Sequence, residues 1–146
     1  MALPTGAGTE TLHAHHFADV DGTTPLILGV QHHVYTILSI IIFCNSLNAA
    51  TDVCILRMVC HDGHAGASGA EPIIARANPA SNETWVWNDK FSFNGYEPTG
   101  TNVFSASEQI AIAAQSGSTV QKIEAAITHA DDDYDITITY LDQDWT

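Results

Sequence analysis

The feature that most limits the possible folds is a series of short β-type segments bounded by turn-forming residues. In the segment 134–141 (YDITITYL), residues 134–140 alternate strictly between tyrosine or isoleucine on one face and aspartate or threonine on the other. Residues 34–45 (VYTILSIIIFCN) are rich in β-branched and aromatic residues, which favour a strand over a helix. No long stretch has a convincing helical period. The pattern therefore predicts an all-β protein.

About eight short antiparallel strands are expected, and this spacing is typical of a β-sandwich or jelly roll. They are predicted at residues 26–30, 34–45, 52–60, 72–75, 84–93, around Ile110 and Ile112, at 120–128 and at 134–141. The segment 52–60 should be a partner of the strand at 34–45, which is apolar on both faces and therefore central. The segment 122–127 (KIEAAI) also fits a helical turn. We prefer a strand that forms a closing hairpin with 134–141 around the acidic residues 131–133.

The first 25 residues have no clear period and are rich in Gly, Thr, Ala and His. We predict an extended N-terminal arm at residues 1–25 and a β-sandwich domain at residues 26–146. Leu3, Leu12 and Phe17 would anchor the arm on its own domain or on a neighbouring subunit, although a disordered tail is the alternative. Trp145 is expected to pack into its own domain or a neighbour. These four residues are the candidate interface residues.

The charges of the chain are few and mostly negative. Charged residues make up 14% of the sequence, and 17 acidic against 4 basic residues give a net charge of −13. Such a chain repels nucleic-acid phosphates and anionic membranes, so neither is an expected partner. A surface with few charges loses its water at low cost, as the centres of protein interfaces do. The cysteines Cys44, Cys54 and Cys60 are interpreted as buried small apolar residues.

Histidines and acidic residues raise the question of a metal site. His61 and His64 could supply neighbouring ligands in a glycine-rich loop, as in a cupin-like metal enzyme, but no third ligand has a defined spacing. The acidic run 131–133 offers too few oxygens for a calcium loop and is better explained as a solvated tip. We therefore expect no metal and no cofactor.

Aromatic residues raise the question of a binding surface. Trp85 and Trp87 share a strand face with Phe91 and Phe93. They could stack on a sugar ring, but one face of a sandwich core is the preferred interpretation.

The sequence contains no nucleophile elbow, P-loop or dinucleotide fingerprint. An enzyme is therefore not expected.

Residues 135–145 (DITITYLDQDW) resemble the ending of small structural proteins from tailed bacteriophages, with an alternating strand, a Tyr-Leu-acidic step and an acidic-Trp pair. Residues 40–51 (IIIFCNSLNAAT) and 83–91 (ETWVWNDKF) resemble the same group. The resemblance implies a β-sandwich capsid decoration (cement) protein that sits on the outer capsid surface, commonly as a trimer, and clamps neighbouring capsid subunits. It implies no catalytic residues.

The sequence thus predicts a non-enzymatic virion structural protein, assembled in the host cytoplasm. Its expected partners are copies of itself, with a trimer favoured, and the major capsid protein. One alternative is an adhesion or glycan-binding module of a phage tail or fibre, acting through Trp85 and Trp87. The other is a cupin-like metal enzyme that uses His61 and His64.

Overall fold

The described part of the chain is built of β-strands and the loops that connect them. The computed structural model describes residues 9–62, 67–96 and 120–145, which contain ten strands and no helix. In chain order these strands are β1 (Thr9–Val20), β2 (Thr24–Leu28), β3 (His33–Ser46), β4 (Cys54–Asp62), β5 (Ala67–Ala70), β6 (Ile73–Ala77), β7 (Thr84–Trp87), β8 (Phe91–Asn94), β9 (Lys122–Ile127) and β10 (Asp133–Asp144). The predicted all-β fold is confirmed, with more strands than expected. The strand predicted around Ile110 and Ile112 lies outside the described residues. In the described ranges, no helix is long and apolar enough to cross a membrane.

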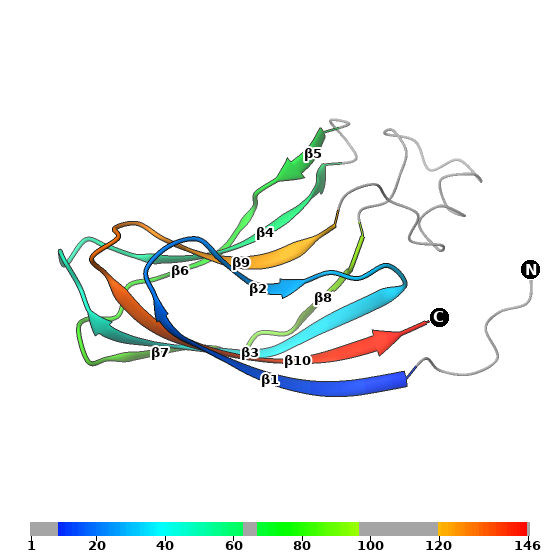
Figure 1. Ribbon diagram of the computed structural model, residues 1–146, viewed down its shortest axis with the longest axis horizontal. Helices are drawn as coiled ribbons and strands as arrows, with labels where there is room; N and C mark the ends of the chain where they lie inside the picture. Colours follow the sequence, from blue (N-terminus) through cyan, green and yellow to red (C-terminus); the bar gives the residue numbers. More distant parts are fainter. Residues whose placement is uncertain (1–8, 63–66, 97–119, 146) are drawn as a thin grey trace, which may run out of the picture.

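The strands form two antiparallel sheets that lie over one another as two layers (Figure 1). Sheet A, the lower layer in Figure 1, has the order β1-β10-β3-β7, and β8 also pairs with β3. Sheet B, the upper layer, has the order β2-β9-β4-β5, and β6 also pairs with β4. Two antiparallel sheets packed in this way make a β-sandwich.

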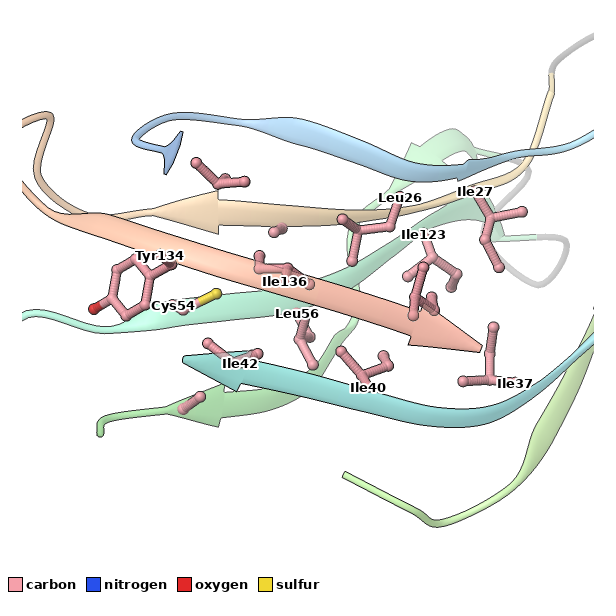
Figure 2. Packing of buried hydrophobic residues seen from close by; sticks show 14 of the residues in the cluster. Leu26, Ile27, Ile37, Ile40, Ile42, Cys54, Leu56, Ile123, Tyr134 and Ile136 are labelled. Carbon is pink, nitrogen blue, oxygen red and sulfur yellow. The ribbon is translucent and has the colours of Figure 1, made fainter. Parts of the chain in front are cut away.

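Apolar side chains from both sheets fill the space between the layers (Figure 2). The alternation of residues 134–141 is confirmed, because Tyr134, Ile136 and Ile138 are fully buried and Tyr140 is nearly so. Other fully buried side chains come from β3, β4 and β9, namely Ile37, Ile40, Ile42, Cys44, Cys54, Leu56 and Ile123. Full burial of one such isoleucine or leucine contributes about 1.5–3 kcal/mol. The central strands β3 and β10 therefore supply much of the stability of the sandwich.

Two strand pairings predicted from the sequence are wrong. The segment after β3 does not pair with it, because β4 belongs to sheet B while β3 pairs with β10, β7 and β8 in sheet A. Likewise β9 and β10 do not form a hairpin, because β9 pairs with β2 and β4. The loops at 47–53 and 128–132 instead cross from one sheet to the other. Alternation shows which side chains face inward, but the inward faces of both sheets meet in one core.

The segment predicted as an N-terminal arm is largely part of the sandwich. From Thr9 to Phe17, β1 pairs with β10 without interruption, and β2 already begins in sheet B at Thr24. The predicted boundary at residue 25 therefore does not separate an arm from a domain in the structure. Because β1 is an edge strand, backbone pairing holds it, and among its apolar side chains Phe17 and Val20 pack on the core cluster. The sequence of β1 therefore shows little alternation between apolar and polar residues.

The aromatic segment 84–93 is two strands rather than one. β7 and β8 both pair with β3, and residues 88–90 separate them. Trp85, Trp87 and Phe91 pack against the core, and Phe93 is part of it. The predicted common face of these four aromatic residues is therefore confirmed, although the strand is interrupted.

Three backbone segments approach one another closely where β2 ends and β9 begins. The Gly29 N–H donates to the Gln121 carbonyl at 2.9 Å, and the Gln121 N–H donates to the Gly95 carbonyl at 2.9 Å. A Cβ atom on Gly95 would lie 1.9 Å from the Val30 oxygen, and one on Gly29 would lie 2.1 Å from the Gly95 oxygen. Only glycine permits such an approach. These glycines therefore join the end of β8 in sheet A to sheet B.

Candidate functional site: a sparsely charged sheet face with an open edge

The side of sheet A that faces away from the core carries very little charge. Residues opposite one another in a ladder share a face of the sheet. The registers therefore place on this side Glu10, Leu12, Ala14, His16, Val34, Thr36, Ser39, Ile41, Phe43, Thr84, Val86, Ser92, Asn94, Asp135, Thr137, Thr139, Leu141 and Gln143, of which only Glu10 and Asp135 are acidic. We call this set the outer face of sheet A. Leu12, Val86 and Ile41 are 65%, 52% and 39% exposed. Large apolar side chains at the surface, set among mostly uncharged residues, are typical of interaction surfaces.

The outward side of sheet B is built around ion pairs instead. The Glu124 side chain is only 2% exposed. Its Oε1 accepts a hydrogen bond of 2.7 Å from Arg57 Nε, and its Oε2 lies 2.8 Å from Lys122 Nζ. Arg57 also contacts Glu71 Oε2 at 2.7 Å. Burial raises the pKa of Glu124, but hydrogen bonds and charge from Lys122 and Arg57 outweigh burial and hold it below its usual value. Two of the four basic residues of the chain thus form ion pairs on the outward side of sheet B, and the outer face of sheet A contains no lysine or arginine.

β1 leaves one edge of sheet A open. Within the described residues no strand pairs with the side of β1 that faces away from β10. Proteins usually protect such an edge with lysine, proline or a bulge. β1 contains neither lysine nor proline, and its only irregularity lies between Phe17 and Val20, where Asp19 has a φ of 54°. The regular part of the strand is therefore competent to pair with another strand.

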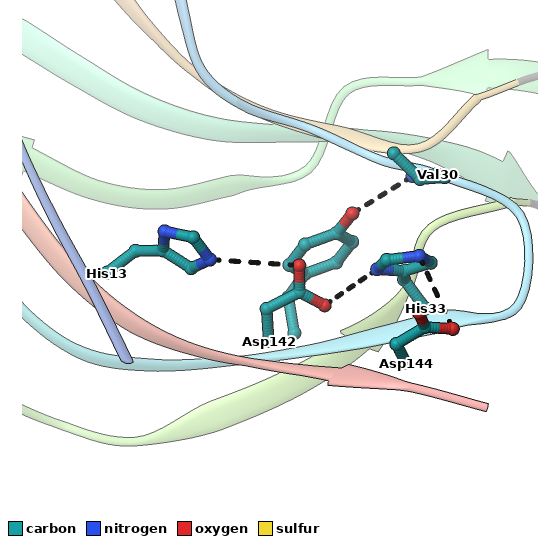
Figure 3. A network of polar contacts seen from close by, with 6 residues as sticks. His13, Val30, His33, Asp142 and Asp144 are labelled. Carbon is teal, nitrogen blue, oxygen red and sulfur yellow. Dashed lines mark hydrogen bonds and ion pairs between the residues drawn. The ribbon is translucent and has the colours of Figure 1, made fainter. Parts of the chain in front are cut away.

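Histidine, tyrosine and carboxylate side chains gather on the inward side of β1, β3 and β10, near the end of β10 (Figure 3). His33 Nδ1 lies 2.8 Å from Asp142 Oδ1, and His13 Nε2 lies 3.9 Å from Asp142 Oδ2. His33 Nε2 is also 3.7 Å from Asp144 Oδ1. The His13 ring stacks on Tyr140 with centroids 5.1 Å apart. These contacts hold the beginning of β1 and of β3 against β10.

The tyrosines of this network are not acid–base groups at neutral pH. Burial raises the pKa of Tyr35 to about 12, and the nearby charge of Asp142 adds to this effect. Burial likewise raises the pKa of Tyr140, again with a contribution from Asp142. Tyr35 Oη accepts a hydrogen bond of 3.1 Å from the Val30 N–H. We therefore interpret both rings as packing and hydrogen-bonding groups.

The carboxylates of the predicted acidic tip have different surroundings. Asp131 is exposed as expected, but Asp132 is 1% exposed and its Oδ1 accepts a hydrogen bond of 2.8 Å from the Asn48 N–H. The prediction of a solvated tip is therefore wrong for Asp132, which joins the loop before β10 to the loop after β3. Burial was not foreseeable because the two loops meet only in the folded chain.

Ligand atoms that converge closely enough for a metal ion occur at one place in the described residues. Asp19, Asp133 and Asp135 each bring a carboxylate oxygen within 4.8 Å of the other two. The Asp19 N–H donates to Asp135 Oδ1 at 3.1 Å. Three carboxylates fall short of the six to eight oxygens that calcium takes, and no histidine belongs to this group.

The four residues predicted to contact neighbours lie in different surroundings. Leu12 lies on the outer face of sheet A and is exposed. Trp145 is 42% exposed, and its N–H donates to the His32 carbonyl at 2.9 Å. Phe17 is half-buried against the core of its own domain. Leu3 lies outside the described residues. Leu12 and Trp145 are therefore accessible to a partner, whereas Phe17 stabilises its own sandwich.

The residues behind the two alternative functions give no support to either. His61 belongs to β4, but its side chain and the whole of His64 lie outside the described part, so the structure does not test the alternative of a metal site there. Trp85 and Trp87 are half-buried and packed on the core, with ring centroids 6.3 Å apart. The core interpretation of both tryptophans is confirmed, and the aromatic surface that suggested glycan binding faces inward.

Ile41 and Val86 were not recognised as functional candidates from the sequence. β3 is central in sheet A, as predicted, but only one of its two apolar faces is covered by sheet B. Ile41 pairs with Val86 on the uncovered face. Both residues stand in continuous apolar runs, residues 40–43 and 85–87, and such a run does not reveal which face a second sheet will cover.

Comparison with known proteins gives little further information. No protein-family model matches the chain, and no curated protein matches it. A solved structure that resembles it comes from a single-particle study of the three-dimensional structure of Maize Chlorotic Mottle Virus. The similarity covers 94% of this chain and 93% of that chain, with 15% sequence identity and a TM-score of 0.28. A TM-score this low does not establish a shared topology.

Proposed function

We propose that this chain is a non-enzymatic structural protein of a virus particle, of the capsid decoration type. The observation that carries the proposal is the outer face of sheet A, which presents Leu12, Ile41 and Val86 among threonines and serines on a chain with a net charge of −13. A surface with this composition binds by burying area rather than by pairing charges.

The size of this face is compatible with a contact that is repeated many times. Four neighbouring strands, each contributing about nine residues, span roughly 20 Å by 30 Å. Covering that area on both partners buries about 1,200 Å², the low end for a specific interface. One such contact is modest, but many copies on one shell strengthen each other through avidity.

In this role the partners are the major capsid protein and other copies of the chain. The outer face of sheet A binds the outside of the capsid, and the ion-paired side of sheet B faces the solvent. The negative net charge suits the outer surface, where the chain lies away from packaged nucleic acid.

Sedimentation with purified capsid shells of the source virus tests this proposal. The wild-type chain should sediment with the shells, and the double variant Ile41→Lys, Val86→Lys should stay in the supernatant. A matched control is Ile73→Lys, which places one lysine at a 48% exposed isoleucine on the outward side of sheet B and should leave binding unchanged. Failure of the folded wild-type chain to sediment with shells would contradict the proposal.

A further inference from the structure

We infer that two copies of this chain join through their β1 strands, which pair antiparallel across a two-fold axis at His13 and make one continuous sheet from two copies of sheet A. This inference deepens the proposed function, since it names the contact between copies. It starts from the edge of β1, which is regular from Thr9 to Phe17 and which no other strand of the described residues covers.

The geometry of β1 selects the register. The two-fold axis is perpendicular to the sheet, so an outward residue of one copy must lie opposite an outward residue of the other. Because side chains alternate with a period of two, this requires that one residue of β1 lies opposite the same residue of the other copy. The regular ladder of β1 runs from Thr9 to Phe17 and is broken beyond it, where Asp19 has a positive φ. The midpoint of this regular part is His13. Pairing about His13 uses the whole regular edge and forms about nine intermolecular backbone hydrogen bonds.

The charges of β1 favour the same register. Centring on His13 places Glu10 opposite His16 of the other copy, and both side chains lie on the outward side of the sheet. A carboxylate opposite an imidazole is favourable, whereas like charges opposite each other are destabilising. Between Glu10 and Asp19 the strand has no acidic residue, so this edge carries little of the net charge of −13 that opposes the approach of two copies.

The same register gives a role to an exposed side chain that the monomer leaves unexplained. Leu12, 65% exposed, comes to lie opposite Ala14 of the other copy, and the two Leu12 side chains are diagonal neighbours across the join. The outer faces of the two copies then form one sparsely charged surface twice as wide, with Glu10 of each copy at the join. Because an antiparallel strand pair is a two-fold contact, it produces dimers or joins larger oligomers, and by itself it does not build a trimer.

Sedimentation velocity over a range of protein concentrations tests the contact. The wild-type chain should form dimers, and Leu12→Glu should weaken dimerisation by about tenfold or more, because it brings two carboxylates together beside both Glu10 side chains. Val86→Glu is the matched control, since it makes the same change on the same face at the opposite edge of sheet A and should leave dimerisation unchanged. Circular dichroism checks that both variants remain folded.

Cross-linking tests the register. In a Cys60→Ser background, His13→Cys should cross-link efficiently between copies with a short bismaleimide, and Val86→Cys should not. A monomeric wild-type chain, a dimer unaffected by Leu12→Glu, or cross-linking at position 86 but not 13 would overturn the inference. The failure of this inference is distinguishable from the failure of the proposed function. Shell binding without cross-linking at position 13 refutes only the β1 pairing. A β1 dimer that does not bind shells refutes only the capsid role.

Discussion

Two tyrosines in the core differ in one hydrogen bond, and this difference has a measurable consequence. Tyr134 is fully buried, and its hydroxyl has no hydrogen-bond partner among the described residues. Burial, with nearby Asp132, raises its pKa, so the hydroxyl stays neutral. The Tyr35 hydroxyl accepts a hydrogen bond from the Val30 N–H. A buried hydroxyl without a partner costs free energy, whereas a satisfied one contributes to stability.

We therefore expect opposite effects from the same substitution at these two positions. Tyr134→Phe should raise the free energy of unfolding by about 1 kcal/mol, because it removes an unpaired buried hydroxyl. Tyr35→Phe should lower it by about 1 kcal/mol, because the Val30 N–H loses its acceptor. Urea denaturation of both variants measures the difference. Equal losses of stability in both variants would mean that the Tyr134 hydroxyl has a partner.

Glu124 makes stability depend on pH in a defined direction. Its pKa is lowered in the folded state, so its contribution is fully present above the unfolded value near 4.5 and is lost as the pH falls through the lower folded pKa. Glu124→Gln should be destabilised at pH 7, and its difference from the wild type should shrink as the pH falls below 4.5. Denaturation measured across this pH range checks the prediction. Glu71→Gln, which alters an exposed contact with the same arginine, should change stability by about 1 kcal/mol or less.

At the scale of elements, the close approach of three backbone segments determines how the two sheets meet. Gly95 and Gly29 lie so close to neighbouring carbonyls that a Cβ atom on either would overlap one. Gly95→Ala should therefore destabilise the fold by about 1–3 kcal/mol, in the range of other overpacking substitutions. Gly22→Ala is the control, since nothing lies within 4 Å of a Cβ atom there. Thermal unfolding compares the two, and equal melting temperatures would contradict a close crossing at Gly95.

Element pairing is also where prediction from the sequence failed. The segments of β3, β4, β9 and β10 were located correctly, but β4 and β10 were assigned to the wrong neighbours. Consecutive strands can turn back within one sheet or cross to the other, and both arrangements bury the same alternate residues. β1 was missed as a strand for a related reason, since its partner β10 lies at the other end of the chain.

At the scale of the whole molecule, charge is distributed unevenly between the two outward faces. The net charge of −13 opposes any association of copies, while the face and edge inferred to make contact carry little of it. Added salt shortens the screening length from about 10 Å at 0.1 M to about 3 Å at 1 M. Association through uncharged surfaces should therefore strengthen with salt. Dimer dissociation constants at pH 8 in low and high salt measure this, and weaker association in high salt would indicate an ionic interface instead.

The sequence by itself determined that the chain is all-β, and it correctly identified the buried face of β10, from Tyr134 to Tyr140, and the inward position of Trp85 and Trp87. These are local properties, because alternation with a period of two is written in neighbouring residues. Only the tertiary structure decided that Leu12, Ile41 and Val86 share one sparsely charged face and that β1 is an open edge among the described strands. Those properties depend on which distant strands share hydrogen bonds and on which face of a sheet the other sheet covers, and no local pattern specifies either.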